Sequence, residues 1–468
     1  MFDTINVPVW LFALLVLVAT FATFSWLLIP SARLFLRRRV NRVIDDVNTR
    51  LQIELRPFQL TRRQTLIDRL TFDPEIVQAI NDEAQSSGST REALSSRVTR
   101  YAREIVPAFN AYLYFRLGYW LARGITHRLY RVRIAQLDDT RFADIDPQAT
   151  VVFVINHRSN MDYVLLSCLV AERTALSYAV GEWARVWPLQ SLVKSMGGFF
   201  VRRSSRNPLY RKVLERYVHM ASREGVCQAV FLEGGLSKDG LMREPKMGFL
   251  GYMLREFDPV RDRDVVMVPV GINYDRTLED RTLLRGLDDT AERRTALFAV
   301  RTTLGFIWRN IRLMLGSRWR RLGYASAAFG SPVSMREYYA DNSSLLSDDG
   351  KLLDVEPLAN QLAASLERLI PVLPVAAVAA ALLQSETAVV EESTLLTSAK
   401  EHVSLAQDRG AVIGIPQTTQ HYSLVTALEM LVIRRIVERD ENERYHIPTE
   451  SRQILAYYAN SIAWIHAN

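Results

Sequence analysis

The chain has 468 residues and 49% of them are hydrophobic, which is enough to build a large core and excludes an intrinsically disordered protein. The net charge of +7 favours anionic partners: phospholipid surfaces, phosphorylated substrates or nucleic acid. The chain has only two cysteines, Cys168 and Cys227, which both lie in largely apolar segments, so a disulfide framework and a cysteine zinc site are excluded. A reducing, cytoplasmic setting is the simplest interpretation for the main body.

A long apolar run lies near the beginning of the chain. Residues 7–29 carry no charge, and about 20 such residues cross the hydrocarbon core of a bilayer. Asp3 is the only charge before this run, whereas arginines are frequent between residues 33 and 42. By the positive-inside rule we expect residues 1–30 to form a single transmembrane anchor in the cell (inner) membrane, with the body of the protein in the cytoplasm. A buried core helix is the alternative interpretation.

A helical region, partly at the membrane surface, is predicted for residues 31–127. Residues 33–56 combine arginines with apolar residues near helical spacing, which is typical of an interfacial helix or of a solvated one. Residues 60–85 have a helical pattern, and Asp73, followed by proline, predicts the start of its second half. Residues 91–126 are predicted to form an aromatic-rich helix that faces either the core or lipid.

Strand and helix patterns alternate in residues 128–342. Strands are predicted at residues 130–137, 150–157, 229–235, 265–274 and 324–335. Helices are predicted between several of them, at residues 162–173, 187–196, 209–224 and 249–257. This alternation predicts an α/β core, in which helices cover the sheet.

Two later segments have distinct compositions. Residues 293–321 carry eight arginines, no acidic residue and many large apolar residues, which favours an interfacial helix. Its aromatic residues are mixed with long aliphatic ones, so lipid is favoured over nucleic acid as its partner. Residues 343–468 are predicted to be mainly helical, and the apolar run at 371–383 is too short to cross a bilayer, so we expect a buried helix there.

The segment INHRSNMDYVLL (155–166) holds the first candidate site. A buried strand leads to His157, and Asp162 follows five positions later. On one continuous helix the two side chains would diverge, but a strand-to-helix turn can bring them together, and Ser159 and Asn160 are good helix caps for such a turn. The carboxyl end of a strand is also where open α/β sheets place their sites.

A histidine and a carboxylate in this arrangement favour general base catalysis. A neutral imidazole accepts the proton of an attacking hydroxyl near pH 7, and a carboxylate fixes its tautomer. No G-x-S-x-G serine elbow is present, so the hydroxyl is predicted to belong to a substrate. From spacing alone, a structural histidine bonded to a helix start is the alternative.

Three more segments are candidates for binding a phosphorylated ligand. In MGGFFVRR (196–203), the planar guanidinium groups of Arg202 and Arg203 are suited to binding phosphate. The alternative is that the two arginines lie on a solvated edge of the protein. FLEGGLSKDG (231–240) resembles a phosphate-cradling loop after a strand, although it is not a Walker A motif and an ordinary glycine-rich turn is possible. In MVPVGINY (267–274), Pro269 is awkward in a central strand and is predicted to mark a strand end near the site.

In this order, the four blocks resemble the glycerophospholipid acyltransferase superfamily, whose first block is His-x4-Asp. HRSNMDYVLL, GGFFVRR, FLEGG with PKMG, and VPVGINY are most similar to the glycerol-3-phosphate acyltransferase branch, and the Glu-Gly-Gly of the third block favours that branch. The similarity is strong over residues 150–275, and it extends to ILAYYANSI (454–462) near the carboxyl terminus.

The resemblance implies a transfer of an acyl group from acyl-CoA or acyl carrier protein to the sn-1 hydroxyl of glycerol 3-phosphate. It implies His157 as general base and Asp162 as its orienting partner. The substrate-binding residues that it implies are Arg203, Glu233, Gly234, Gly235, Ser237 and Pro269, with Arg202 and Lys238 as additional phosphate contacts. No cofactor and no metal are expected, and the partners are membrane lipid and the two substrates, without nucleic acid.

One departure from the family pattern bears on the acceptor. Leu236 stands where an arginine usually follows Glu-Gly-Gly, and Lys238 stands where a second arginine is common. Losing a planar fork should weaken phosphate binding. Lysophosphatidate and dihydroxyacetone phosphate therefore stay alternative acceptors. A non-catalytic lipid-surface scaffold is disfavoured because His157 and Asp162 are both intact, and no groove-reading motif supports a nucleic-acid binder.

Overall fold

The computed structural model describes residues 55–285 and 321–466, apart from residues 138, 172–173, 188, 203–204, 206, 348–353, 386 and 388, together with the isolated residues 8 and 16. The segments predicted as an anchor (1–30) and as an interfacial helix (293–321) therefore lie almost entirely outside the described residues. Within the described part of the chain, no helix combines the length and apolar character needed to cross a membrane.

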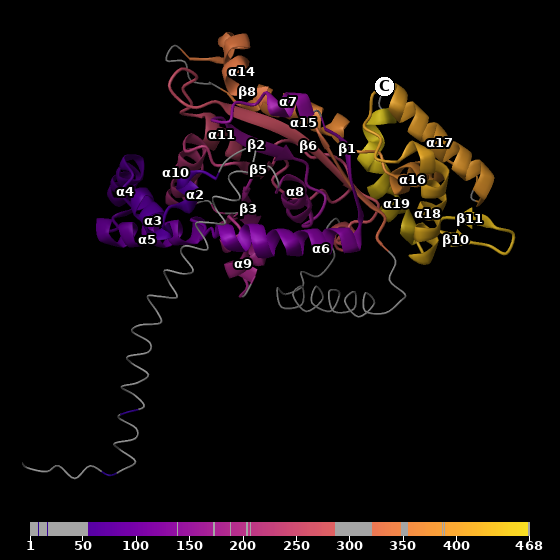
Figure 1. Ribbon diagram of the computed structural model, residues 1–468, viewed down its shortest axis with the longest axis horizontal. Helices are drawn as coiled ribbons and strands as arrows, with labels where there is room; N and C mark the ends of the chain where they lie inside the picture. The colour runs from indigo at the N-terminus through magenta and orange to yellow at the C-terminus, as the bar shows by residue number, and fades with distance from the viewer. Residues whose placement is uncertain are drawn as a thin grey trace, which may run out of the picture.

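The described residues form an eight-stranded mixed sheet at the centre of the molecule (Figure 1). Its strands, in spatial order, are β1 (Arg131–Gln136), β7 (Tyr324–Phe329), β6 (Val265–Tyr274), β2 (Thr150–Ile155), β5 (Gln228–Phe231), β3 (Ser177–Gly181) and β4 (Gly198–Val201), with β8 (Val333–Ser334) paired to β6. Strands β6, β2, β5, β3 and β4 are parallel, whereas β7 and β8 run antiparallel to β6. The carboxyl ends of the parallel strands therefore meet at one edge of the sheet.

Helices cover both faces of this sheet, as the alternating pattern predicted. Val152 and Val154 of β2 pack into one hydrophobic layer, whereas Val151, Phe153 and Ile155 pack into the other, because successive strand side chains point to opposite faces. The first layer includes α10 (Pro208–Arg223), α11 (Gly248–Leu254), α14 (Met335–Asp341) and α15 (Glu356–Leu369), and the second includes α8 (Asp162–Val170). Burial on both faces explains why β2 is an unbroken apolar run.

Six helical elements of the described residues precede the sheet. They are α2 (Pro57–Leu60), α3 (Arg63–Thr71), α4 (Pro74–Ser87), α5 (Arg91–Ile105), the π-helical η1 (Leu113–Gly118) and α6 (Tyr119–Leu129). Asp73 caps α4, as predicted, because its carboxylate accepts hydrogen bonds from the N–H groups of Glu75 and Ile76. The prediction of one helix over residues 91–126 is wrong: α5 ends at Ile105, and Pro107 disfavours helical geometry in the residue before it.

The connections between strands carry α7 (Asp139–Ala143), η2 (Glu182–Ala184), α9 (Leu189–Ser195), α12 (Asp280–Arg285) and η3 (Ser343–Leu345). Two strands of the sheet, β3 and β4, were not predicted as strands. Their sequences are short and contain serine, tyrosine and glycine, so they lack the β-branched run that marks β2 and β6. The strand predicted at residues 229–235 ends early, at Phe231, and the glycines that follow form a turn.

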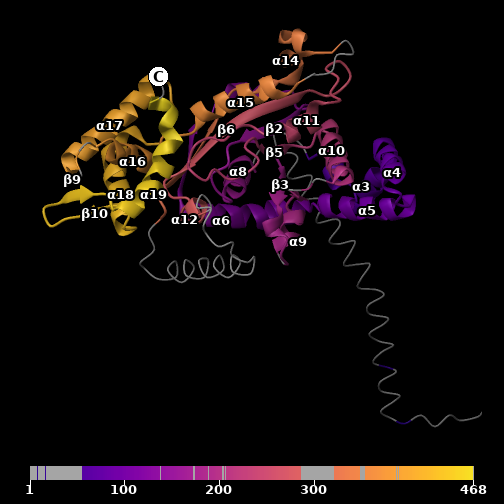
Figure 2. The same cartoon turned by 180° about the vertical axis from the view of Figure 1, so that it is seen from behind.

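The carboxyl-terminal residues form a helical body beside one end of the sheet (Figures 1 and 2). Its elements are α16 (Pro374–Gln384), α17 (Glu392–Asp408), α18 (Gln420–Ile433), α19 (Arg452–Ala459), the 3-10 turns η4 (Gln417–Thr419), η5 (Thr449–Ser451) and η6 (Asn460–His466), and a small sheet of β9 (Val389–Glu391), β10 (Glu438–Arg439) and β11 (Arg444–His446). Helix α16 is buried, as predicted for its apolar run, because α17, α18 and α19 pack around it.

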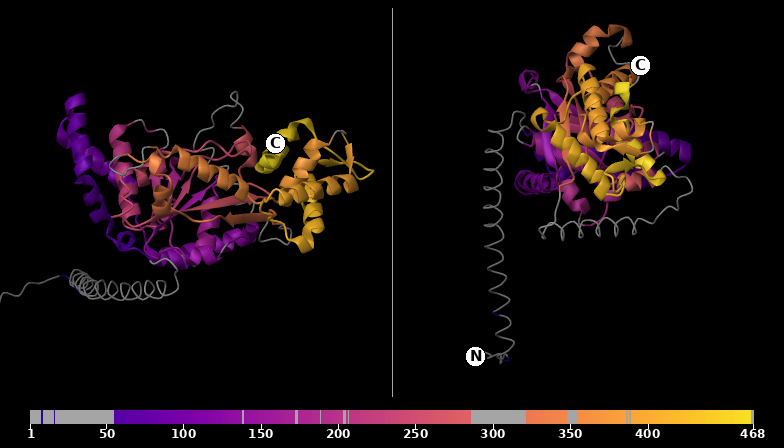
Figure 3. Two further views of the ribbon diagram at one scale, coloured as in Figure 1. Left: turned by 90° about the horizontal axis from the view of Figure 1, so that it is seen from above. Right: turned by 90° about the vertical axis from the view of Figure 1, so that its right-hand side faces the viewer.

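Viewed from above, the sheet lies between this carboxyl-terminal body and the helices α3 to α5 at the opposite end (Figure 3). Helix α15 packs on β6 and shares the core of the sheet, although it follows the domain boundary predicted at residue 342.

Candidate active site

Strand β2 places His157 at the carboxyl edge of the sheet, where the chain turns into α8. The imidazole Nδ1 lies 3.0 Å from Oδ2 of Asp162, the first residue of α8. Both residues are buried, with 2% and 0% of their surface exposed. The turn between strand and helix thus brings together two side chains that a continuous helix would separate.

Asp162 is held in one orientation by donors from three directions. Its Oδ2 also accepts hydrogen bonds from the N–H groups of Arg158 (2.8 Å) and Ser159 (3.0 Å). Its Oδ1 accepts one from the hydroxyl of Tyr274, the last residue of β6, at 2.8 Å. Burial and the adjacent Asp162 carboxylate raise the pKa of Tyr274 well above its ordinary value, so this phenol stays a neutral donor.

His157 is fixed on its ring and on its backbone. The imidazole stacks on Phe231, the last residue of β5, with ring centroids 3.5 Å apart and planes inclined by 10°. The His157 N–H donates to Oε1 of Glu233 at 2.7 Å, and its carbonyl accepts from the N–H of Ser237 at 2.9 Å. A base that is already oriented loses little entropy when the reacting hydroxyl arrives.

Glu233 joins the turn after β5 to the histidine loop, the turn at residues 156–161 between β2 and α8. Its second oxygen, Oε2, accepts from the N–H of Arg243 at 3.0 Å. Burial raises the pKa of Glu233 to about 7, although the two backbone donors oppose this shift. Both oxygens therefore bind main chain, and Glu233 positions His157 through the backbone.

The predicted phosphate loop has one tight turn and one exposed cation. Gly234 adopts a φ of +65°, which favours glycine, and Gly235 follows it in the turn. The Ser237 hydroxyl is buried, donates to the carbonyl of Leu241 at 2.8 Å and accepts from the N–H of Gly240 at 3.0 Å. In this structure the Ser237 hydroxyl therefore holds the loop together. Lys238 is exposed.

A residue outside the predicted set holds the turn between His157 and Asp162. Glu279 accepts from the Ser159 hydroxyl at 2.8 Å and from the N–H and side-chain amide of Asn160 at 3.2 and 3.1 Å. The prediction that Ser159 or Asn160 caps α8 is wrong, because Met161 occupies the N-cap position. These polar side chains are instead engaged by a carboxylate from beyond β6, which no local pattern could reveal.

The carboxyl-terminal body also contacts these loops. The buried guanidinium of Arg158 lies over the ring of Tyr457 in α19, 5.3 Å from its centroid, and donates to the carbonyl of Gly240. The side-chain amide of Asn460 donates to the carbonyl of Asp239 at 2.9 Å. The segment ILAYYANSI therefore packs against both the histidine loop and the predicted phosphate loop at residues 231–240, called the glycine loop below.

Arg202 follows β4 at the same edge of the sheet, but its guanidinium already has a partner. It binds both oxygens of Glu104 on α5, at 2.8 and 2.6 Å, and also lies against the rings of Tyr101 and Tyr210. The bond to Glu104 raises the pKa of Arg202 further above its usual range. Arg203, the other predicted phosphate ligand of this block, lies outside the described residues.

The chain matches two protein families in succession. Residues 136–273 match the family described as Acyltransferase, and residues 309–467 match the family described as Glycerol-3-phosphate acyltransferase C-terminal region. Two successive parts of the chain are therefore similar to the acyltransferase superfamily and to its glycerol-3-phosphate acyltransferase branch. The first match spans the sheet from β1 to β6 and contains the His157–Asp162 pair.

Curated relatives of this chain carry the name glycerol-3-phosphate acyltransferase. The protein from Pseudomonas aeruginosa (strain UCBPP-PA14) is 29% identical over 371 residues, which cover 76% of this chain and 43% of that protein. The protein from Ectopseudomonas mendocina is 30% identical over 283 residues, covering 60% of this chain and 32% of that protein. The chain thus spans less than half the length of these relatives.

A solved structure is also similar to this chain. It is the 1-acyl-sn-glycerophosphate (LPA) acyltransferase, PlsC, from Thermotoga maritima, at 15% identity and a TM-score of 0.28, covering 64% of this chain and 98% of that one. This likeness is too weak to support an inference about the present site.

Pro269 lies differently from its predicted place. It is the fifth of the ten residues of β6, not a strand end, and it is opposite Val154 of β2. On its other side, β6 pairs with β8 up to Met267 and with β7 from Val270, so Pro269 falls where the antiparallel partner changes. A residue without an N–H is tolerated there because no ladder hydrogen bond is required of it on that side.

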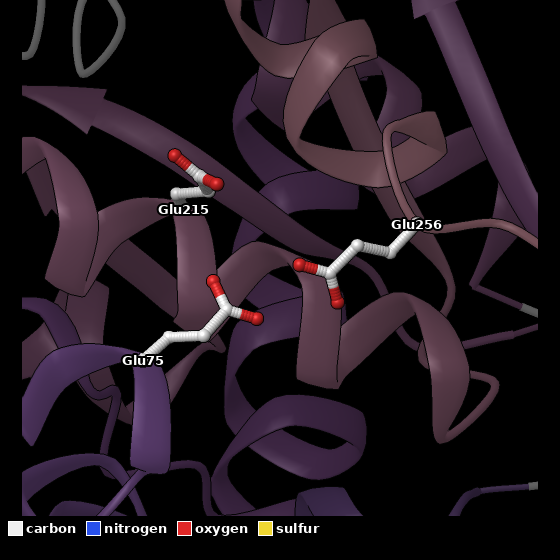
Figure 4. Close-up of side chains that lie close together, drawn as sticks. All are labelled: Glu75, Glu215 and Glu256. Atoms are coloured by element: carbon white, nitrogen blue, oxygen red, sulfur yellow. The ribbon is translucent and has the colours of Figure 1, made fainter. Parts of the chain in front are cut away.

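Three carboxylates away from this edge also converge. The side chains of Glu75, Glu215 and Glu256 point toward one another (Figure 4). However, Arg216 bonds to both Glu75 and Glu256, and Lys212 bonds to both Glu75 and Glu215. Because cations already bind these carboxylates, we interpret the cluster as a salt-bridge network that joins α4 to α10.

Proposed function

We propose that this chain transfers an acyl group from a thioester, acyl-CoA or acyl carrier protein, to the sn-1 hydroxyl of glycerol 3-phosphate, giving 1-acyl-glycerol 3-phosphate. The observation that carries the proposal is the buried His157–Asp162 pair at the carboxyl edge of β2. The family matches and the names of the relatives support the acceptor.

In the proposed mechanism, the Nδ1–H of His157 donates a hydrogen bond to Asp162 and keeps its proton, so Nε2 is the atom that acts as base. Nε2 removes the proton of the acceptor hydroxyl while the oxygen attacks the thioester carbonyl. The new C–O bond forms, the C–S bond breaks, and the thiolate leaves and recovers the proton from the imidazolium. Asp162 stabilises the imidazolium between these steps.

Two of the positions expected near the acceptor phosphate do not offer it a free cation, because Arg202 is bound by Glu104 and Leu236 is apolar. Arg203 and Lys238 are then the cations that we propose for the phosphate, with Gly234 and Gly235 allowing close approach of the backbone. Lysophosphatidate and dihydroxyacetone phosphate are the alternative acceptors.

We also propose that residues 1–30 anchor the protein in the inner membrane, with the catalytic body on the cytoplasmic side. The apolar run without charge and the arginines that follow it support this topology. A membrane location would suit a reaction whose product is a lipid.

The decisive experiment measures acyl transfer from a labelled acyl-CoA by the purified full chain and by His157→Ala. We expect a loss of at least ~100-fold in kcat, the lower end for removing a general base. His421→Ala is the matched control, because this histidine is exposed on α18, and it should keep full activity. A His157→Ala protein that is folded and retains more than a tenth of the activity would contradict the proposal.

The acceptor is tested by supplying glycerol 3-phosphate, dihydroxyacetone phosphate and lysophosphatidate in parallel with one acyl-CoA. The proposal requires the highest kcat/KM with glycerol 3-phosphate. A preference for either alternative would retain the chemistry of His157 and reassign the substrate.

A further inference from the structure

Helix α6 has a hydrophobic face that the described residues leave uncovered. Leu117, Trp120, Leu121 and Ile125 are exposed, and Trp120 is 70% exposed. They follow the i, i+3, i+4, i+8 spacing of one helix face. The opposite face, which includes Ala122 and the residues at 126 and 129, is buried toward α8. Helix α6 is therefore apolar on two sides, although only one side contacts the core.

A second set of exposed apolar residues lies on α9 and the turn before it. Val186, Trp187, Leu189 and Leu192 are exposed, and Trp187 is 82% exposed, although tryptophan usually buries most of its surface. Large apolar groups that protrude together in this way mark an interaction site more often than a free surface.

The two sets belong to neighbouring elements on one side of the molecule. Met196, directly after α9, packs against Gly118, directly before α6, so closely that a Cβ on this glycine would lie 2.1 Å from the Met196 Cε. The N–H of Asn110 donates to the carbonyl of Ser195 at 2.9 Å. Figures 1 and 2, seen from opposite directions, both show α6 and α9 along the lower side of the body.

The charge around these residues is mainly positive. Residues 105–137 contain no acidic residue, and the exposed arginines Arg116, Arg123 and Arg128 lie on or next to α6. The nearby acids Glu104 and Glu182 both pair with Arg185. Exposed tryptophans and leucines among arginines are the composition that binds the interface of an anionic bilayer.

We propose that α6 and α9 form a membrane-docking surface that inserts Trp120 and Trp187 into the headgroup region of an anionic phospholipid bilayer. This surface is separate from the proposed anchor at residues 1–30, and it does not depend on the acyltransferase reaction. Docking would fix the orientation of the catalytic body as well as its distance from the membrane.

The position of Trp187 gives this docking a consequence for the active site. The turn that holds Trp187 leaves the carboxyl end of β3, and β3 is parallel to β2, whose carboxyl end holds His157. Insertion of Trp187 would therefore bring the lipid surface close to the β3 end of the edge that bears the active site.

The test uses full-length protein in phospholipid vesicles, with single cysteines labelled by an environment-sensitive fluorophore. Trp120→Cys and Trp187→Cys report on the proposed surface. Val260→Cys, 87% exposed between α11 and β6, and Tyr422→Cys, exposed on α18, are the matched controls. The native Cys168 and Cys227 are buried, and burial raises the pKa of the Cys227 thiol to about 12, so both should resist labelling.

With a quencher attached to the lipid acyl chains, we expect quenching at positions 120 and 187 to exceed that at the controls by at least about twofold in vesicles of phosphatidylcholine and phosphatidylglycerol. The double substitution Arg116→Gln, Arg123→Gln should reduce this quenching more in the anionic vesicles than in phosphatidylcholine alone. Quenching at positions 120 and 187 that is no stronger than at Val260→Cys would overturn the proposal. This is the result expected if another segment of the chain, or a second copy of it, covers the surface. Acyl transfer is not part of the readout, so failure here leaves the proposed function untouched.

Discussion

The loop around His157 and the neighbourhood of Arg202 both lie at the carboxyl edge of the sheet, yet their polar groups are used differently. Around His157, the ring, the backbone and the partner carboxylate are each held by a different element, namely β5, the glycine loop and β6. Around Arg202, the guanidinium is bound by one carboxylate, Glu104, from a helix that precedes the sheet.

This difference separates a preorganised group from a neutralised one. The donors and acceptors at His157 leave it one orientation, which is what a base needs before the substrate arrives. Arg202 is as well fixed, but a carboxylate already satisfies its fork. We therefore expect His157 to contact the substrate and Arg202 to stabilise the fold. Each prediction below tests one of these two roles.

The largest effect is expected from Asp162→Asn. The amide cannot accept the hydrogen bonds of the imidazole and of two backbone N–H groups in the same way, and it favours the wrong histidine tautomer. We expect kcat to fall by about 10³-fold, within the range for loss of acid–base catalysis. The measurement is the steady-state rate with glycerol 3-phosphate, and Asp144→Asn in the segment before β2 is the control. A loss below tenfold would mean that the pair is structural.

The second effect is on stability and follows from Glu233. Its pKa of about 7 lies above the reference value of 4.5 for the unfolded chain. Between these values the folded protein binds more protons at this group than the unfolded chain does, so the free energy of unfolding falls as pH rises. Below pH 4.5 the penalty is absent, and above pH 7 it is complete, at most about 3 kcal/mol.

Chemical unfolding of the native protein and of Glu233→Gln at several pH values measures this penalty. The difference in unfolding free energy between the two should shift in favour of the variant as pH rises from 4.5 to 7, whereas Glu244→Gln should follow the native curve. A constant difference across this range would show that burial does not raise the pKa of Glu233.

The smallest effect concerns Glu104 and Arg202. Glu104→Gln should lower the free energy of unfolding by about 1–2 kcal/mol, because charged hydrogen bonds to Arg202 and Arg185 are lost. Arg202→Lys should cost a similar amount, and the double variant should cost less than the sum, since the two residues interact directly.

For Arg202→Lys, we expect KM for glycerol 3-phosphate to change less than about threefold, since Glu104 already binds the guanidinium group of Arg202. A rise of tenfold or more would place Arg202 on the phosphate after all, and it would remove the contrast with His157.

The sequence predicted the centre of this protein better than its periphery. Strands β2 and β6 were identified because both of their faces are buried, which leaves an unbroken apolar run, whereas β3 and β4 were missed because they are short and contain glycine and serine. The long helix expected before the sheet was divided at Pro107, and the place of Pro269 within β6 depended on which strand pairs with which.

The sequence by itself determined the buried strands β2 and β6 and the approach of His157 to Asp162, because each of these depends on residues at most a few positions apart. Only the tertiary structure decided what surrounds that pair: Tyr274, Glu279 and Tyr457 lie more than a hundred residues from the loop that they hold. The chemistry of a contact across such separations is fixed by how the sheet and the carboxyl-terminal body pack, and no local pattern records it. The same reason explains why Glu104, from a helix that precedes the sheet, was found on Arg202.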